Sequence, residues 1–94
     1  MNQIELFPAA VAPPVVNRRT LRTIAREIRA TWPRVYFGAV PYLDAMDTME
    51  TIDQPYYQDS GLSIVTYFLG NAGTWRGPDA KRIKAELRTM TGLK

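Results

Sequence analysis

The chain has 94 residues, which is the size of one small domain. Hydrophobic residues make up 46% of the chain and charged residues 22%, a balance typical of a folded globular protein. The sequence contains neither Cys nor His, which excludes disulfides, thiolate nucleophiles, Cys-based zinc sites and histidine general bases. We therefore expect a binding or interaction protein and not an enzyme, with no cofactor and no bound metal.

The charges are distributed unevenly along the chain. Residues 18–34 carry a net charge of +5, residues 35–60 a net charge of −5, and residues 61–94 a net charge of +4. Two basic segments thus flank an acidic one. This pattern allows either neutralisation between neighbouring elements or the presentation of opposite faces to different partners.

The first 16 residues contain three prolines and show neither helical nor strand periodicity. They predict an extended, proline-containing arm ahead of a single domain over residues 17–94. The arm has no basic start, and its prolines interrupt the apolar stretch, so we expect no secretory signal and a cytoplasmic protein. No apolar run approaches the roughly 20 residues of a membrane span, so we expect no membrane contact.

A first helix is predicted after Asn17. Its apolar residues recur at the spacing of one helix face, and they are Leu21, Ile24, Ala25, Ile28 and Trp32. We expect Asn17 or Thr20 to cap the start of this helix and Pro33 to end it at Trp32. Its outer face carries a ridge of arginines at spacings of four, four and three residues, namely Arg18, Arg22, Arg26 and Arg29.

A second and a third helix are predicted in the middle of the chain. Residues 34–40 form a connector with a turn at Gly38, and Pro41 is expected to begin a helix that runs to about Thr51. A loop over residues 53–60 follows, in which Asp59 or Ser60 caps the next segment. Residues 62–72 are apolar on nearly every side, which fits a buried helix or a buried strand. We favour a helix, since a lone strand would have no pairing partner.

A last helix is predicted to begin at Pro78 and to end near Gly92. Its inward residues are expected to be Ala80, Ile83, Leu87 and Met90, and its outward residues Lys81, Lys84 and Arg88. The expected fold class is therefore all-α, a small bundle of about four short helices. Most of the aromatic residues should lie in its core, while Tyr56 and Tyr57, in the predicted loop, form a candidate exposed recognition patch.

The arm carries a candidate docking peptide. Residues 3–7, Gln-Ile-Glu-Leu-Phe, resemble the pentapeptide with which bacterial replication and repair proteins dock on the DNA sliding clamp, commonly written Gln-Leu-(Ser/Asp)-Leu-Phe. Gln3, Leu6 and Phe7 match outright, while Ile4 and Glu5 are mild departures. The resemblance implies that the Gln3 amide fixes the register by hydrogen bonds while Leu6 and Phe7 enter an apolar cleft. Alternatively, Ile4, Leu6 and Phe7 pack on the helical domain itself.

Basic side chains form a second candidate surface. They are Arg18, Arg22, Arg26 and Arg29 on the first helix and Arg76, Lys81, Lys84 and Arg88 near the last. Guanidinium groups match phosphate oxygens, so the alternative partner is nucleic acid or a nucleic-acid-loaded host defence complex. The opposite interpretation is that these basic side chains are solvated on the outside of the helices and that the five acids of residues 35–60 pair with them. A third, that these acids mimic DNA, is weaker because five acids are few.

Residues 24–88 resemble a family of small bacteriophage and prophage proteins, through IAREIRATW, VYFGAVPYLDAM, DSGLSIVTYFLGNAGTWRG and AKRIKAELR. The resemblance implies phage origin and a compact helical body, and it brings no activity, catalytic residue or cofactor. Small phage proteins commonly bind and redirect a host machine, so the leading hypothesis is a phage-type adaptor or inhibitor that docks on the sliding clamp through residues 3–7. The sequence leaves the oligomeric state open.

Overall fold

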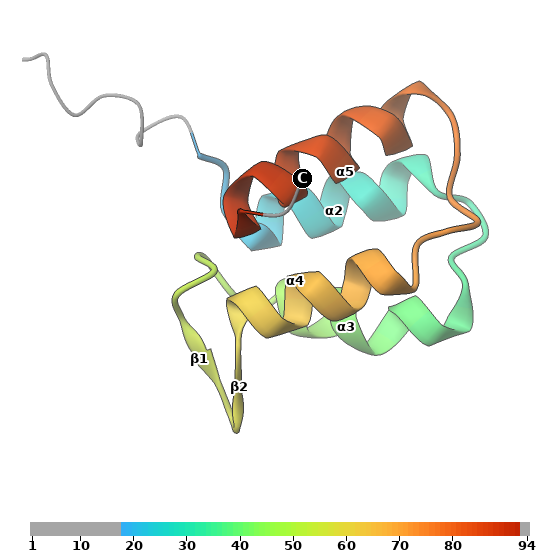
Figure 1. Ribbon diagram of the computed structural model, residues 1–94. Helices are drawn as coiled ribbons and strands as arrows, with labels where there is room; N and C mark the ends of the chain where they lie inside the picture. The colour runs from blue at the N-terminus through green and yellow to red at the C-terminus, as the bar shows by residue number, and fades with distance from the viewer. Residues whose placement is uncertain (1–17, 93–94) are drawn as a thin grey trace, which may run out of the picture.

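The computed structural model describes residues 18–92. This part of the chain contains four α-helices, which are α2 (Leu21–Thr31), α3 (Val40–Met46), α4 (Gly61–Gly70) and α5 (Pro78–Thr91). A 3₁₀ helix, η2 (Phe37–Ala39), leads into α3, and the antiparallel strands β1 (Pro55–Tyr56) and β2 (Asp59–Ser60) precede α4. Figure 1 shows two layers, α2 beside α5 and α3 beside α4, with the hairpin at one end. The predicted four-helix, all-α fold is confirmed.

The start of α2 is held by its own cap and by the segment that follows α3. The Thr20 hydroxyl oxygen accepts a hydrogen bond from the Thr23 N–H at 3.1 Å. The N–H groups of Leu21 and Arg22 donate to the carbonyls of Glu50 and Met49 at 3.0 and 2.9 Å. These bonds satisfy N–H groups that have no partner within the helix.

The second helix is shorter than predicted. α3 ends at Met46, well before Thr51, and the N–H groups of Thr48 and Met49 donate to carbonyls three residues earlier, both at 3.0 Å. A longer helix would point the carbonyls of Met49 and Glu50 along its own axis, whereas here they accept from the start of α2. The prediction was wrong because this competing contact comes from a distant part of the chain.

The entry to α3 also differs from the prediction. Gly38, the predicted turn, lies in the single 3₁₀ turn of η2, whereas Pro41 is the second residue of α3 and not the first. A Cβ at Gly38 would lie 2.5 Å from the Tyr36 ring and 2.8 Å from the Asn71 side-chain oxygen. A larger residue here would require the Tyr36 ring and the Asn71 side chain to move.

The third segment is a helix, as predicted. Ser60 is its N-cap, and the hydroxyl oxygen accepts from the Ser63 N–H at 3.3 Å. The loop predicted before it contains the β1–β2 hairpin, in which Tyr56 pairs with Asp59. At the start of the hairpin tip, Tyr57 has a φ of 55°, which is an unfavourable backbone conformation for a residue with a bulky side chain.

The core lies between the two layers and is organised around three aromatic rings. Trp32 stacks on Trp75 with 5.4 Å between ring centroids and 10° between planes. Phe68 meets both indoles edge-on, at 6.3 and 6.5 Å. These geometries suit the quadrupoles of the rings. The predicted inward faces of α2 and α5 are buried in the same core.

Most of the aromatic residues, however, do not lie in this core. Those with exposed side chains are Tyr36, Phe37, Tyr57 and Tyr67, while Tyr42 and Tyr56 are only partly buried. The prediction of a mainly buried aromatic set was therefore wrong. Four short helices offer interior space for few large rings, and two tryptophans with one phenylalanine occupy much of it.

Candidate functional site

The arginine ridge on α2 faces acidic residues of α3 and of the segment after it. The ion pairs are Arg22 with Glu50 at 3.8 Å, Arg26 with Asp47 at 3.6 Å, and Arg29 with Asp44 in direct hydrogen-bond contact. Of the four ridge arginines, only Arg18, which is exposed, forms no ion pair within residues 18–92. Three of the four ridge arginines thus have carboxylate partners inside the molecule, which lowers the net positive charge of this face.

Arg19, which stands outside the ridge spacing, links α2 to α5. Its guanidinium donates to Glu27 at 2.6 Å and to both carboxylate oxygens of Glu86, at 2.6 and 3.0 Å. Arg82 donates to Glu27 at 2.6 Å and to Asp79 at 3.1 Å. The hydrogen bond from Arg82, followed by that from Arg19, lowers the pKa of Glu27. The hydrogen bond to Glu86 raises the pKa of Arg19. Sequence spacing gave no sign of this network.

A second group of basic residues surrounds a hollow where the α4–α5 connector meets α5. Lys81, Lys84 and Arg88 follow one another at three and four residues on a single face of α5, and Arg76 comes from the connector. Together with Trp75 they line a hollow of about 550 Å³, and no acidic residue lines it. We call this feature the basic hollow.

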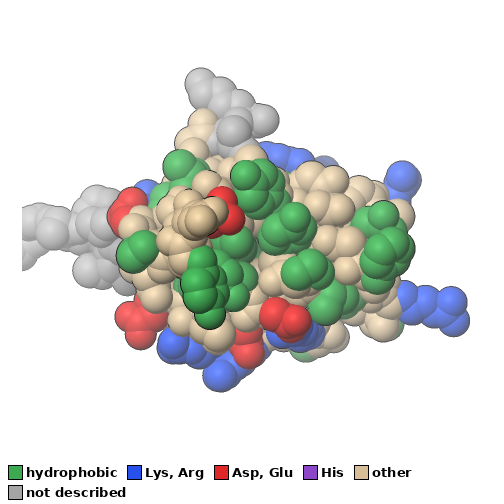
Figure 2. Space-filling view, turned by 90° about the horizontal axis from the view of Figure 1, so that it is seen from below, with side chains coloured by type: hydrophobic (Ala, Val, Ile, Leu, Met, Phe, Trp, Pro, Cys, Tyr) green, Lys and Arg blue, Asp and Glu red, His purple; other side chains and the backbone are tan. Residues whose placement is uncertain are grey.

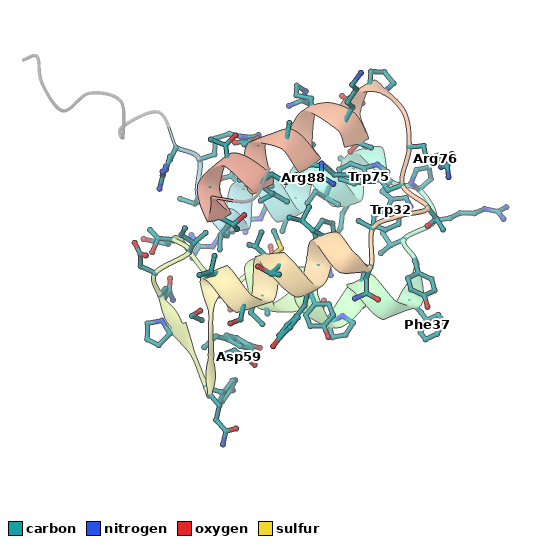
Figure 3. All side chains as sticks on the ribbon, in the orientation of Figure 1. Trp32, Phe37, Asp59, Trp75, Arg76 and Arg88 are labelled. Carbon is teal, nitrogen blue, oxygen red and sulfur yellow. The ribbon has the colours of Figure 1, made fainter. Side chains whose placement is uncertain are left out.

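Lys84 is the most enclosed cation of the basic hollow. Its Nζ donates to the Trp75 carbonyl at 2.7 Å and lies 5.9 Å from the centre of the Trp75 ring. Burial lowers the pKa of Lys84, and the positive charges of Arg88 and Arg76 lower it further. Figure 3 labels Trp75, Arg76 and Arg88, which line the same hollow. The expectation that Lys84 points outward thus holds only in part.

The charged side chains on the two polar flanks of α5 differ in whether they form ion pairs. Asp79 and Glu86 lie on the flank toward α2, where Arg82 and Arg19 bind them. On the other flank, Lys81 and Arg88, like Arg76 of the connector, form no ion pair and no side-chain hydrogen bond within residues 18–92. None of the cations of the basic hollow forms an ion pair within residues 18–92, whereas three of the four arginines of the α2 ridge do.

A third feature is an exposed apolar surface on the layer of α3 and α4. We call it the aromatic face and define it by Tyr36, Phe37, Val40, Tyr42 and Tyr67. Phe37 is 79% exposed and Tyr67 47% exposed, and the rings of Tyr42 and Tyr67 meet across the two helices at 5.6 Å. Figure 2 views this layer and shows hydrophobic side chains spread over it. Residues 35–75 contain no Lys and no Arg, so the face itself carries no cation.

The predicted patch at Tyr56 and Tyr57 is divided by the hairpin. Tyr57 is 90% exposed at the tip, while Tyr56 is half-buried and packs against the core. Their rings meet edge-on at 4.9 Å. Of the pair, only Tyr57 offers a whole ring to a partner.

Residues 3–7 lie outside the described part of the chain, so the structure gives no geometry for Gln3, Ile4, Leu6 or Phe7. Within residues 18–92, no three acidic side chains are grouped to bind a metal ion. In the same residues no helix is both long and apolar enough to cross a bilayer. Comparison with protein-family models, curated proteins and solved structures finds no match to this chain.

Proposed function

We propose that this chain is a small interaction protein that docks on another protein through the aromatic face. The observation that carries the proposal is the exposure of several aromatic side chains on one layer of a very small domain. Tyr and Phe are enriched at protein interfaces, and Tyr contributes a large contact area at little entropic cost and is enriched among the residues that dominate binding energy. Large apolar side chains gathered on the surface of a soluble domain are typical of interaction sites.

The partner we propose is the bacterial DNA sliding clamp, engaged by residues 3–7 in the bacterial cytoplasm. The support is the match of Gln3, Leu6 and Phe7 to the clamp-binding pentapeptide. Ten residues lie between Phe7 and Arg18, so the eleven steps of the covalent chain limit their separation to about 40 Å. Within that range the aromatic face provides a second contact on the clamp or blocks its other clients. In this proposal the chain is a phage-type adaptor or inhibitor.

The test is a titration of purified sliding clamp with the full chain by calorimetry. We expect micromolar affinity, which is lost in Leu6→Ala, Phe7→Ala because two apolar anchors are removed. Phe37→Ala, Tyr67→Ala should weaken binding several-fold if the aromatic face is the second contact. Thr66→Ala, an exposed polar position on α4, is the matched control and should bind as the wild type.

The outcomes separate the two parts of the proposal. If the clamp binds neither the wild type nor any variant, the clamp is not the partner. If Leu6→Ala, Phe7→Ala binds as the wild type, the pentapeptide is not the anchor. If only Phe37→Ala, Tyr67→Ala is indistinguishable from the control, the aromatic face takes no part in clamp binding.

A further inference from the structure

The basic hollow is an uncompensated cationic site on the α5 side of the molecule, while the aromatic face belongs to the α3–α4 layer. Four cations line the hollow, and no carboxylate lies among them. Every other ionisable side chain of α5 is bound to a partner, since Arg82 holds Asp79 and Arg19 holds Glu86. An anion from outside the described residues would remove the repulsion among these cations.

The spacing of the cations indicates the form of the anion. Lys81 and Arg88 are seven residues apart on one helix face, so their backbones are separated by about 10 Å along the axis. A single phosphate group is too small to contact both ends of such a row. A strand of nucleic acid, with one phosphate per nucleotide, places successive charges along it.

The remaining parts of the hollow also suit a phosphate. Gly77 is the N-cap of α5 and offers no capping side chain, so the positive end of the helix dipole opens on the hollow beside Pro78. The Lys84 ammonium is held in place by the Trp75 carbonyl and by the face of the Trp75 ring. A cation fixed in this way loses little side-chain entropy when a phosphate binds.

We propose that the basic hollow binds successive backbone phosphates of a nucleic-acid strand through Arg76, Lys81, Lys84 and Arg88. We do not assign the α2 ridge as the binding surface, because Asp44, Asp47 and Glu50 pair with three of its four arginines. This proposal is independent of docking through the aromatic face and residues 3–7. It concerns different side chains, so either can fail alone.

The experiment measures binding of a fluorescently labelled 20-nucleotide oligothymidylate to the full chain by anisotropy, over a range of NaCl concentrations. Four phosphate contacts predict a plot of log K against log salt with a slope of about −3. Binding beside Trp75 should also change the tryptophan emission, because Lys84 lies over that ring. Inorganic phosphate and polyglutamate, each at matched total charge, are the comparison ligands.

The decisive variants remove the same charge from the two basic faces. Lys81→Gln, Arg88→Gln should weaken oligonucleotide binding roughly tenfold and make the salt slope shallower by about 1.4. Arg22→Gln, Arg26→Gln removes two α2 arginines with long ion pairs, and it should weaken binding less than about threefold.

Circular dichroism of both double variants establishes that they are folded. Equal weakening by the two variants would show that net charge alone attracts the oligonucleotide and would overturn the site. Equal affinity for polyglutamate would overturn the assignment to phosphate. Equal competition by inorganic phosphate would replace the nucleic-acid strand with a free phosphate ion.

Discussion

Trp32 and Trp75 stack face to face, with 5.4 Å between ring centroids and 10° between ring planes. Trp32 directly follows α2, and Trp75 lies in the connector before α5, so the stack joins two segments that are far apart in the sequence. The Trp75 carbonyl also accepts the hydrogen bond from Lys84. The same residue therefore supports the core and positions one cation of the basic hollow.

Trp32→Ala should be among the most damaging substitutions in the chain. Trp32 is 5% exposed, and truncation of a buried tryptophan to alanine costs about 3–5 kcal/mol through lost burial and the resulting cavity. Small domains have about 5–15 kcal/mol of stability in total, so the variant should be largely unfolded at moderate urea. Urea titration followed by far-UV circular dichroism measures this. A urea midpoint equal to that of the wild type would show that the Trp32–Trp75 stack does not contribute substantially to stability.

Substitution by alanine should have opposite effects on stability at the two glycines of α4. A Cβ at Gly61 would lie 2.5 Å from the Thr51 carbonyl oxygen and 2.6 Å from Ile52 Cα, both backbone atoms. Gly61→Ala should therefore destabilise by about 1–3 kcal/mol, since the backbone must move.

Gly70 lies at the end of the same helix, and a Cβ added there would meet no neighbouring atom within 4 Å. Gly70→Ala should stabilise by about 0.5–1 kcal/mol, because alanine loses less backbone entropy on folding. Thermal unfolding of the two variants is the measurement. Melting temperatures that shift in the same direction would contradict the close packing at Gly61.

The link between α2 and α5 predicts a dependence of stability on pH. Hydrogen bonds from Arg82 and Arg19 lower the pKa of Glu27 from its ordinary value of 4.5. The contribution of Glu27 to stability is therefore complete above about pH 4.5 and is lost as the pH falls through the lowered value. Because Glu27 is 29% exposed, water screens the pairs, and Glu27→Gln should cost only about 1 kcal/mol at pH 7.

The control for this prediction is Glu50→Gln. Glu50 is 63% exposed and lies 3.8 Å from Arg22, so its removal should leave the free energy of unfolding unchanged. Urea titrations at pH 7 and at successively lower pH compare the three proteins. The difference between wild type and Glu27→Gln should shrink as the pH falls below about 4.5. A difference that stays constant with pH would show that Glu27 acts by packing and not by charge.

The helices were predictable because their causes are local. The apolar spacing from Leu21 to Ile28 and the prolines at positions 33 and 78 are visible in the sequence and predict α2 and α5 closely. The end of α3 was not predictable, because Met49 and Glu50 bind the start of α2 through backbone groups. Such bonds leave no pattern in side-chain identity.

The sequence was also insufficient to predict which of the two basic surfaces keeps its positive charge. In the sequence both surfaces are rows of cations. Only the fold shows that Arg26 and Arg29 pair with acids of α3 and of the segment after it. Lys81 and Arg88 have no such acidic partner within residues 18–92. The acidic charge of residues 35–60 suggested that some pairing occurs. It could not show which basic segment lies beside it, because that depends on how the two helix layers pack.

The hairpin tip predicts a conflict between stability and binding. Tyr57 has a φ of 55°, in the left-handed region that costs a residue with a bulky side chain about 1–2 kcal/mol, yet its ring is 90% exposed and gains little from the fold. Tyr57→Asn should stabilise by about 1 kcal/mol, since asparagine tolerates this conformation, and raise the melting temperature by about 4–8 °C.

Tyr57→Phe is the matched control, because it keeps the ring and the backbone conformation. It should have the same melting temperature as the wild type. If the tyrosine ring contacts a partner, Tyr57→Asn should bind that partner less tightly while being the more stable protein, whereas Tyr57→Phe should retain most of the affinity. Differential scanning calorimetry and a clamp titration on the same preparations measure both quantities. An unchanged melting temperature in Tyr57→Asn would show that the backbone conformation of Tyr57 does not lower the stability of the fold. There would then be no conflict between stability and binding at this position.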